Sequence, residues 1–287
     1  MITPMRPDGA VNYGEAARLA NWLCDRGTTG LVVCGTTGEG PTLRDDEKLR
    51  LFETIAGAAG TRAGVIANTG GNDTQRSIEA SKSAARCGVK ALLLVAPYYN
   101  KPPQPGLISH FLSIVEAAGL PAMVYNIPGR TGVNISADSM LALADHPLIV
   151  AVKESSGDLA QIGEIARRAP AGFDVYSGDD HLALPTAAVG GCGVVSVASH
   201  VAGRDTAAML DAFFAGDVGA ATAAHHRLMP LWRALFAVTS PIPVKAAMQS
   251  LGFDVGRCRP PLCELTQAQR HSLDAAIAPW RDSALRH

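Results

Sequence analysis

Short apolar runs alternate with amphipathic stretches along most of the chain. Seven apolar runs predict strands, at residues 31–34, 64–67, 91–95, 122–125, 148–153, 173–177 and 194–197. These runs are continuously apolar, which is typical of parallel strands that are covered on both faces. Between them the apolar positions recur at helical spacing, which predicts helices at 16–24, 45–59, 74–89, 107–118, 136–144, 159–168 and 181–189.

This repeated strand and helix order predicts an α/β fold, a (β/α)8 TIM barrel with a C-terminal helical extension. We expect residues 1–204 to form the barrel and residues 205–287 to form a helical region packed on it. The short segment 2–4 is the expected eighth strand, at the start of the barrel. An open doubly wound sheet is the alternative, but no G-x-G-x-x-G motif follows the first strand, which disfavours a dinucleotide-binding fold.

Composition narrows the classes of function. The 25 basic and 26 acidic residues of this 287-residue chain give a net charge of −1, so nucleic acid is not an expected partner. Charged residues make up 18%, below the roughly 25% of an average domain, which suggests a homo-oligomer whose interface covers part of the surface. No apolar run is long enough to span a membrane and no signal peptide is recognisable. The six cysteines are scattered without metal-ligand spacing, so we expect reduced thiols, a cytoplasmic protein and no metal site.

Polar side chains collect where the predicted strands end. They include Thr36, Thr37, Asn68, Tyr98, Tyr99, Asn100, Tyr125, Asn126, Lys153, Glu154, Ser177, Asp179, Asp180 and Ser196. In a barrel these positions share the rim on which active sites are built. Taken singly, each has an ordinary explanation, since a tyrosine at a strand end usually packs and a Thr-Thr pair before glycine usually forms a turn.

Lys153 is the most informative of these residues because it ends an apolar strand that we expect to be buried. Burial disfavours the charged form of an amine, and a neutral amine attacks carbonyl carbons to form a Schiff base. The alternative is a lysine that reaches from the strand end into solvent.

Three neighbouring features suit a Schiff-base mechanism. Tyr125 ends the preceding strand, so its ring is expected beside the amine, where its hydroxyl can move protons. Residues 35–38, Gly-Thr-Thr-Gly, offer amides and hydroxyls that suit a small carboxylate. Arg130 can hold a second carboxylate through two parallel hydrogen bonds.

With these motifs the chain resembles the dihydrodipicolinate synthase family, within the pyruvate-dependent class I aldolase and N-acetylneuraminate lyase superfamily. The resemblance covers essentially the whole chain. The matching segments are 35–39 (GTTGE), 97–100 (PYYN), 125–132 (YNIPGRTG), 152–155 (VKES), 177–180 (SGDD), 193–196 (GVVS) and 241–245 (PIPVK). Arg130 favours the synthases over the lyases and aldolases that act on sugar acids.

The resemblance implies a role for each matching residue. Lys153 is implied as the Schiff-base lysine for pyruvate and Tyr125 as the general acid and base, with Thr36 and Tyr99 as its partners in a proton relay. The implied assembly is a dimer of dimers in which Tyr99 reaches into the neighbouring subunit's site. The implied substrate-binding residues are Thr37 for the pyruvate carboxylate, Arg130 for the carboxylate of aspartate semialdehyde, and Gly178 and Val195 through main-chain contacts.

The implied reaction condenses pyruvate with L-aspartate 4-semialdehyde to give 4-hydroxy-tetrahydrodipicolinate, in diaminopimelate and lysine biosynthesis. It needs no metal or other cofactor beyond the covalent pyruvate Schiff base on Lys153. A sister aldolase that accepts another aldehyde, and a non-catalytic paralogue that binds a small ligand, are the alternatives.

The chain also departs from the family at several positions. Gly40, Ser240 and His200 replace residues that are common in relatives, and the segment before Thr3 and Pro4 is short. The resemblance implies that Asp45, Lys48 and Arg76 match the lysine-inhibition pocket of sensitive relatives, beside Asn72 and Tyr98. Because two of these side chains are cations that would face a cationic ligand, we expect weak or absent inhibition by lysine.

Overall fold

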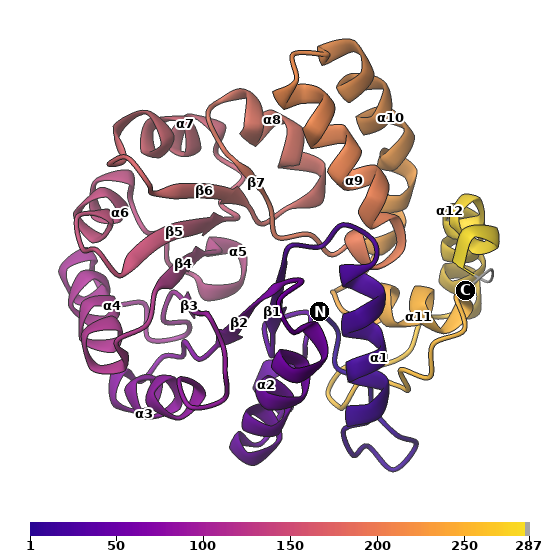
Figure 1. The fold of residues 1–287 in the computed structure, drawn as a ribbon, viewed down its shortest axis with the longest axis horizontal. Coiled ribbons are helices and arrows are strands. Elements are labelled where there is room, and N and C mark those ends of the chain that lie inside the picture. The colour runs from indigo at the N-terminus through magenta and orange to yellow at the C-terminus, as the bar shows by residue number, and fades with distance from the viewer. Residues whose placement is uncertain (285–287) are drawn as a thin grey trace. The chain divides into compact units, whose positions relative to one another are not determined.

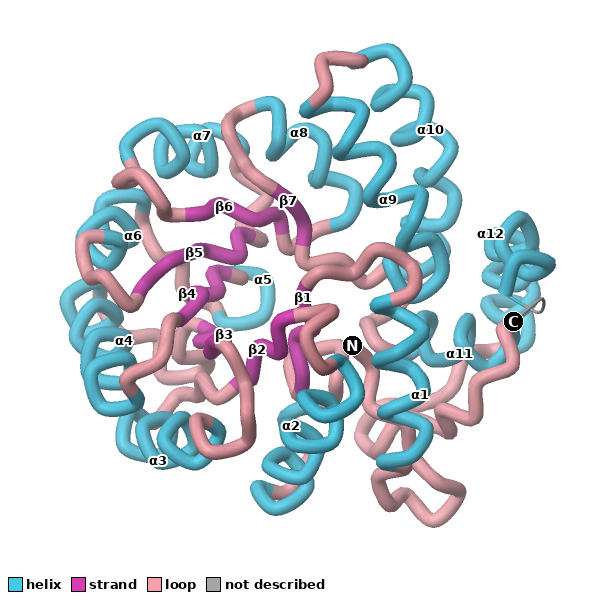
Figure 2. Tube along the Cα trace, in the orientation of Figure 1, coloured by secondary structure: helices cyan, strands magenta, loops and turns pink. Residues whose placement is uncertain are grey.

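The computed structural model of the protein describes residues 1–284, and its internal contacts divide the chain into two compact units. One unit joins residues 1–64 to the residues from 197 onward, and the other comprises residues 65–196. Figure 1 labels the elements of both units, and Figure 2 separates helices from strands by colour.

The unit of residues 65–196 is a sheet of parallel strands that follow one another in chain order, each joined to the next through a helix. Figure 2 shows the longer helices of this unit along the outer side of these strands, whereas the single turn at residues 128–131 is drawn on their inner side. The strands are β2 (Gly64–Asn68), β3 (Ala91–Val95), β4 (Ala122–Asn126), β5 (Ile149–Glu154), β6 (Asp174–Ser177) and β7 (Gly193–Val194). The helices are α3 (Thr74–Ala84), α4 (Gln104–Ala118), α5 (Pro128–Thr131), α6 (Ala137–Ala144), α7 (Leu159–Arg168), the 3-10 turn η2 (Asp180–Leu182) and α8 (Ala183–Ala188).

Burial explains why the apolar runs form these strands. All five residues of β4 are buried, and the three central residues of β3 are buried as well, so neither face of the sheet is left to water here. Side chains at the starts of three helices accept hydrogen bonds from free backbone N–H groups: Asp73, Ser136 and Asp158. Helix α3 ends five residues earlier than the apolar spacing predicts, and Gly88, at φ +77°, turns the chain toward β3.

The other unit is mainly helical. Its elements are α1 (Tyr13–Cys24), β1 (Gly30–Val33), the 3-10 turn η1 (Gly40–Thr42), α2 (Asp45–Ala59), α9 (Ser199–Phe214), α10 (Val218–Leu235), α11 (Ile242–Ser250) and α12 (Gln267–Ala284). Helix α1 packs on α2, and α10 packs on both α9 and α12. Within residues 1–284, no helix has the length and apolar character needed to cross a bilayer.

Strands form at all seven positions expected between residues 31 and 197, although the last is only Gly193–Val194 instead of 194–197, and the eighth, at residues 2–4, does not form. Pro4 has no N–H to donate to a ladder. Thr3 instead donates its hydroxyl to the carbonyl oxygen of Gly38 at 2.6 Å, and Met5 donates its N–H to the carbonyl oxygen of Val255 at 3.0 Å. The Ile2 N–H donates to Nε2 of His200 at 3.1 Å, so separate hydrogen bonds hold this segment rather than a strand ladder.

Candidate active site

Lys153 and Tyr125 lie side by side at the carboxyl ends of β5 and β4. The two residues are register partners in these parallel strands, so their side chains leave the sheet on the same face. The Lys153 Nζ atom lies 4.0 Å from the centroid of the Tyr125 ring. Tyr125 is buried, with 4% of its surface exposed. The expected placement of the ring beside the amine is therefore what the structure shows.

The burial of Lys153 differs from our expectation. Within this chain the residue is half-buried rather than buried, although Ala151 and Val152 before it are buried. Its side chain leaves the sheet on the face opposite to Val152 and Glu154, which are buried, so the end of β5 is packed on one face and partly open on the other. The Tyr125 ring is one part of the environment of the partly exposed amine in this chain.

Gly178 leaves room for the Lys153 side chain. A Cβ atom at this position would lie 2.9 Å from Cε and 3.2 Å from Cγ of Lys153, and 1.9 Å from Oγ of Ser155. The Gly178 N–H is already donated to the carbonyl oxygen of Glu154 at 2.8 Å, and the Val195 N–H to that of Ser177 at 2.8 Å. Any main-chain hydrogen bond between these two residues and a ligand therefore uses the carbonyl oxygens of Gly178 and Val195.

A buried polar network fixes the ends of β4 and β5. Asn126 donates from Nδ2 to both carboxylate oxygens of Glu154 at 3.1 Å, and its Oδ1 accepts the Ile135 N–H at 3.0 Å. Burial raises the pKa of Glu154, while hydrogen bonds from Asn126 and Ser156 act against that rise. Because Asn126 and Glu154 directly follow Tyr125 and Lys153, this network holds the ring and the amine in register.

Asp179 belongs to the same site, and we assigned it no role from the sequence. Burial raises the pKa of its carboxyl, and the charges of His181, Lys153 and Arg130 act in the opposite direction. The Asp179 carboxyl group is therefore close enough to Lys153 and Arg130, the two basic residues expected to bind substrates, to interact with their charges. Its place directly after Gly178 in the 177–180 motif was the available signal.

Arg130 lies on α5, the single helical turn that follows β4. Its side chain is exposed, which leaves the guanidinium accessible to a carboxylate from solution. Tyr99 lies in the loop after β3, with a left-handed backbone at φ +72° and 90% of its surface exposed. Within one chain Tyr99 therefore faces solvent.

Thr36 and Thr37 belong to the other compact unit, in the turn after β1. The turn is closed by a hydrogen bond from the Glu39 N–H to the carbonyl oxygen of Thr36 at 3.1 Å and by another from Gly40 to Gly35 at 3.1 Å. Both threonines are half-buried. Within residues 1–284 no cluster of three or more His, Cys, Asp or Glu side chains is arranged to hold a metal ion.

Comparison with known proteins places the chain in a family. Residues 1–279 match the model of the dihydrodipicolinate synthetase family. The chain is 53% identical over 279 residues to the 4-hydroxy-tetrahydrodipicolinate synthase of Symbiobacterium thermophilum, covering 97% of this chain and 95% of that one.

Solved structures agree with this assignment. The dihydrodipicolinate synthase DapA-2 of Bacillus anthracis is 45% identical, with a TM-score of 0.95 over 97% of this chain and 95% of that one. The Aquifex aeolicus dihydrodipicolinate synthase is 39% identical, with a TM-score of 0.96 over 100% and 98%. A synthase from Cyanidioschyzon merolae, solved with lysine bound, is 45% identical, with a TM-score of 0.95 over 97% and 95%. The fold class is thus the expected (β/α)8 barrel with a C-terminal helical extension, and the chain belongs to the dihydrodipicolinate synthetase family.

Proposed function

We propose that the protein is a lyase that condenses pyruvate with L-aspartate 4-semialdehyde to give 4-hydroxy-tetrahydrodipicolinate, in diaminopimelate and lysine biosynthesis. Relatives that are 50–53% identical over nearly the whole chain carry the name of this synthase. The observation that carries the proposal is the Lys153 amine, 4.0 Å from the Tyr125 ring, with Gly178 leaving room beside it.

The proposed first half-reaction forms an enamine on Lys153. The neutral amine attacks C2 of pyruvate, and the resulting carbinolamine loses water to give an imine. Loss of a proton from C3 of the imine gives the enamine. Tyr125 moves these protons, with Thr36 and Tyr99 as its relay partners, while Thr37 holds the pyruvate carboxylate. The Schiff base is the only covalent group that the mechanism uses, and it uses no metal or organic cofactor.

The proposed second half-reaction makes a carbon–carbon bond and releases the enzyme. The enamine attacks the aldehyde carbon of the semialdehyde, whose carboxylate is held by Arg130. The amino group of the semialdehyde then attacks the imine carbon, which closes the ring and displaces Lys153. Gly178 and Val195 contact the bound substrate through their carbonyl groups.

We also propose that the enzyme is a cytoplasmic homo-oligomer, a dimer of dimers in which Tyr99 completes the partner's relay. Support comes from the 90% exposure of Tyr99 and the 41% exposure of the adjacent Tyr98, both large for aromatic side chains. Mixing Tyr99→Phe with Lys153→Ala protein should restore activity, because a mixed dimer contains one complete site. Failure of subunit-exchanged mixtures to regain activity would contradict the shared site.

The acceptor is tested by turnover with pyruvate and either aspartate semialdehyde or a sugar aldehyde that has no carboxylate. We expect turnover only with the semialdehyde. The variant Arg130→Ala should raise its KM about 100-fold, the scale of a lost charged hydrogen-bonded contact, and leave pyruvate trapping unchanged. Efficient turnover of the sugar aldehyde would favour the sister aldolase, and the absence of both turnover and imine formation would favour the non-catalytic paralogue.

A further inference from the structure

Glu39 and Lys245 form a buried ion pair that has no role in the chemistry proposed above. The Lys245 Nζ atom lies 2.6 Å from Oε1 of Glu39, and the two residues are 2% and 3% exposed. They are 206 positions apart in the sequence. A buried pair of this kind is weak evidence for stability, since removing two charges from water is costly, so a specific structural role is the better explanation.

The backbone at Glu39 shows what the pair controls. Glu39 has φ +57° and ψ 30°, a left-handed conformation that side-chain-bearing residues seldom adopt. Cys34, at the other end of the same turn, also has a positive φ of 59°. Between these two residues lie Thr36 and Thr37, so the conformation of the turn determines where the two threonine hydroxyls point.

Close packing leaves the turn few alternatives. A Cβ atom at Gly40 would lie 2.1 Å from the Cys34 carbonyl oxygen, which shows how tightly the turn closes on itself. Each oxygen of the Glu39 carboxylate accepts a hydrogen bond from a different segment, which holds the Glu39 end of the turn in place. Its Oε1 accepts from Lys245 on α11, and its Oε2 accepts the Arg259 N–H at 2.7 Å.

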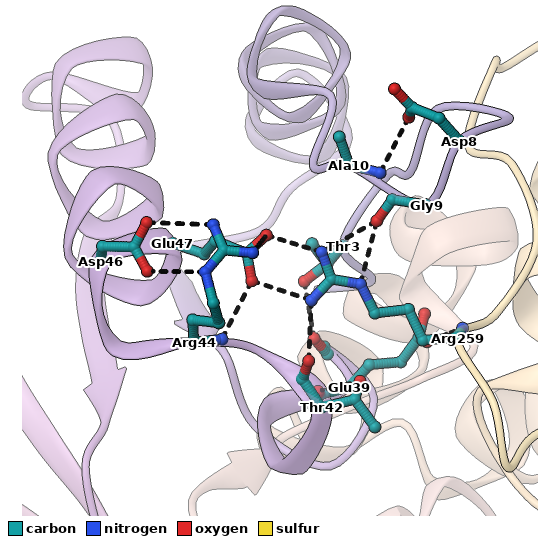
Figure 3. Close-up of polar contacts among 11 residues, drawn as sticks. Thr3, Asp8, Gly9, Ala10, Glu39, Thr42, Arg44, Asp46, Glu47 and Arg259 are labelled. Carbon is teal, nitrogen blue, oxygen red and sulfur yellow. Dashed lines mark hydrogen bonds and ion pairs between the residues drawn. The ribbon is translucent and has the colours of Figure 1, made fainter.

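Arg259 is itself held independently of Glu39, as Figure 3 shows. Its guanidinium donates to both carboxylate oxygens of Glu47 on α2, at 2.6 and 2.8 Å. It also donates to the carbonyl oxygens of Gly9, at 2.8 and 3.0 Å, and of Thr42, at 2.7 Å. Glu39 is therefore attached to a rigid support rather than to a mobile loop.

We propose that Glu39 is a positioning residue, which Lys245 and the Arg259 N–H hold so that the left-handed turn presents Thr36 and Thr37 to pyruvate. The inference rests on the proposed function, because it uses the roles assigned there to the two threonines. It goes further by assigning a task in the reaction to a charge pair that touches no reacting atom.

The test is the double variant Glu39→Gln/Lys245→Met, which removes the pair without leaving one charge buried alone. We expect a folded protein with a KM for pyruvate raised at least 10-fold, a kcat lowered about 10-fold and slower borohydride trapping of pyruvate. The matched control is Asp205→Asn, which weakens the contacts of Asp205 with Arg227 on α10 and Trp280 on α12 and leaves Glu39, Lys245 and Arg259 in place. It should lower the melting temperature and leave the KM for pyruvate unchanged.

The outcomes separate the two proposals. If the unaltered protein traps no pyruvate, the proposed function fails. If it does trap pyruvate and the folded double variant matches it in KM and kcat, the positioning role fails alone. If the double variant does not fold, the same measurements are made on Glu39→Asp, which keeps the charge and shortens the side chain by one methylene. A raised KM then supports positioning, and an unchanged KM overturns it.

Discussion

The buried imidazole of His200 makes part of the acid sensitivity of this protein calculable. His200 is 2% exposed, its Nε2 accepts the Ile2 N–H at 3.1 Å, and its Nδ1 lies 2.8 Å from the carbonyl oxygen of Val197. The first contact requires an unprotonated Nε2, so the ring is neutral with its proton on Nδ1. Burial lowers the pKa of His200 from 6.5 to about 3. Protonation would cost this ring its bond to Ile2.

The magnitude follows from linkage between proton binding and folding. In the unfolded chain the imidazole takes up a proton near pH 6.5, whereas in the folded protein it does so only near pH 3. The contribution of His200 to stability is therefore complete above pH 6.5 and is lost progressively as the pH falls to 3. Lowering the pH from 7 to 4.5 should cost about 2.5 kcal/mol through this one group, a slope near 1.4 kcal/mol per pH unit.

The assay is the pH dependence of urea unfolding for the unaltered protein and for His200→Asn, between about pH 7 and 4.5. Asparagine does not titrate. The free energy of unfolding of the variant should therefore fall less steeply with decreasing pH, by about 1.4 kcal/mol per pH unit. Replacing the exposed His226 by asparagine is the matched control and should leave the steep slope in place. Equal slopes for His200→Asn and the unaltered protein would refute the reasoning, whatever their absolute stabilities.

Two further predictions concern the active site and its regulation. Gly178→Ala should lower kcat/KM about 100-fold with little change in the circular dichroism spectrum, because the added methyl group displaces Lys153 and Ser155. Adding Ser155→Ala should restore part of the rate, and no restoration would argue against a steric cause. Millimolar lysine should leave the rate nearly unchanged if, as the family resemblance implies, the cations Lys48 and Arg76 would face this cationic ligand. A dose series in which millimolar lysine halves the rate would contradict this.

The strands could be predicted because their signal is local. Continuous apolar runs such as those of β3 and β4 identify strands that are covered on both faces without reference to the rest of the chain. The segment 2–4 could not be assigned in this way. Its hydrogen bonds go from Ile2 to His200 and from Thr3 to Gly38, and no pattern within three residues indicates partners so far along the sequence.

The candidate active site could be predicted from the sequence only where it depends on the order of the strands. Tyr125 and Lys153 end consecutive strands of a parallel sheet, so their proximity follows from order alone. The partial exposure of Lys153, the steric role of Gly178 and the electrostatic position of Asp179 depend on side-chain packing at the rim of the sheet, which sequence spacing does not specify. The pairing of Glu39 with a lysine 206 residues away has no local signal at all.

The central claim, that Lys153 forms a Schiff base with pyruvate, is tested most directly by adding sodium borohydride to a mixture of the protein and pyruvate and then weighing the product. The account predicts a mass increase equal to one reduced pyruvate imine, mapped by peptide analysis to Lys153 and lost in Lys153→Ala. The absence of an adduct in folded protein, or an adduct on another lysine, would contradict it.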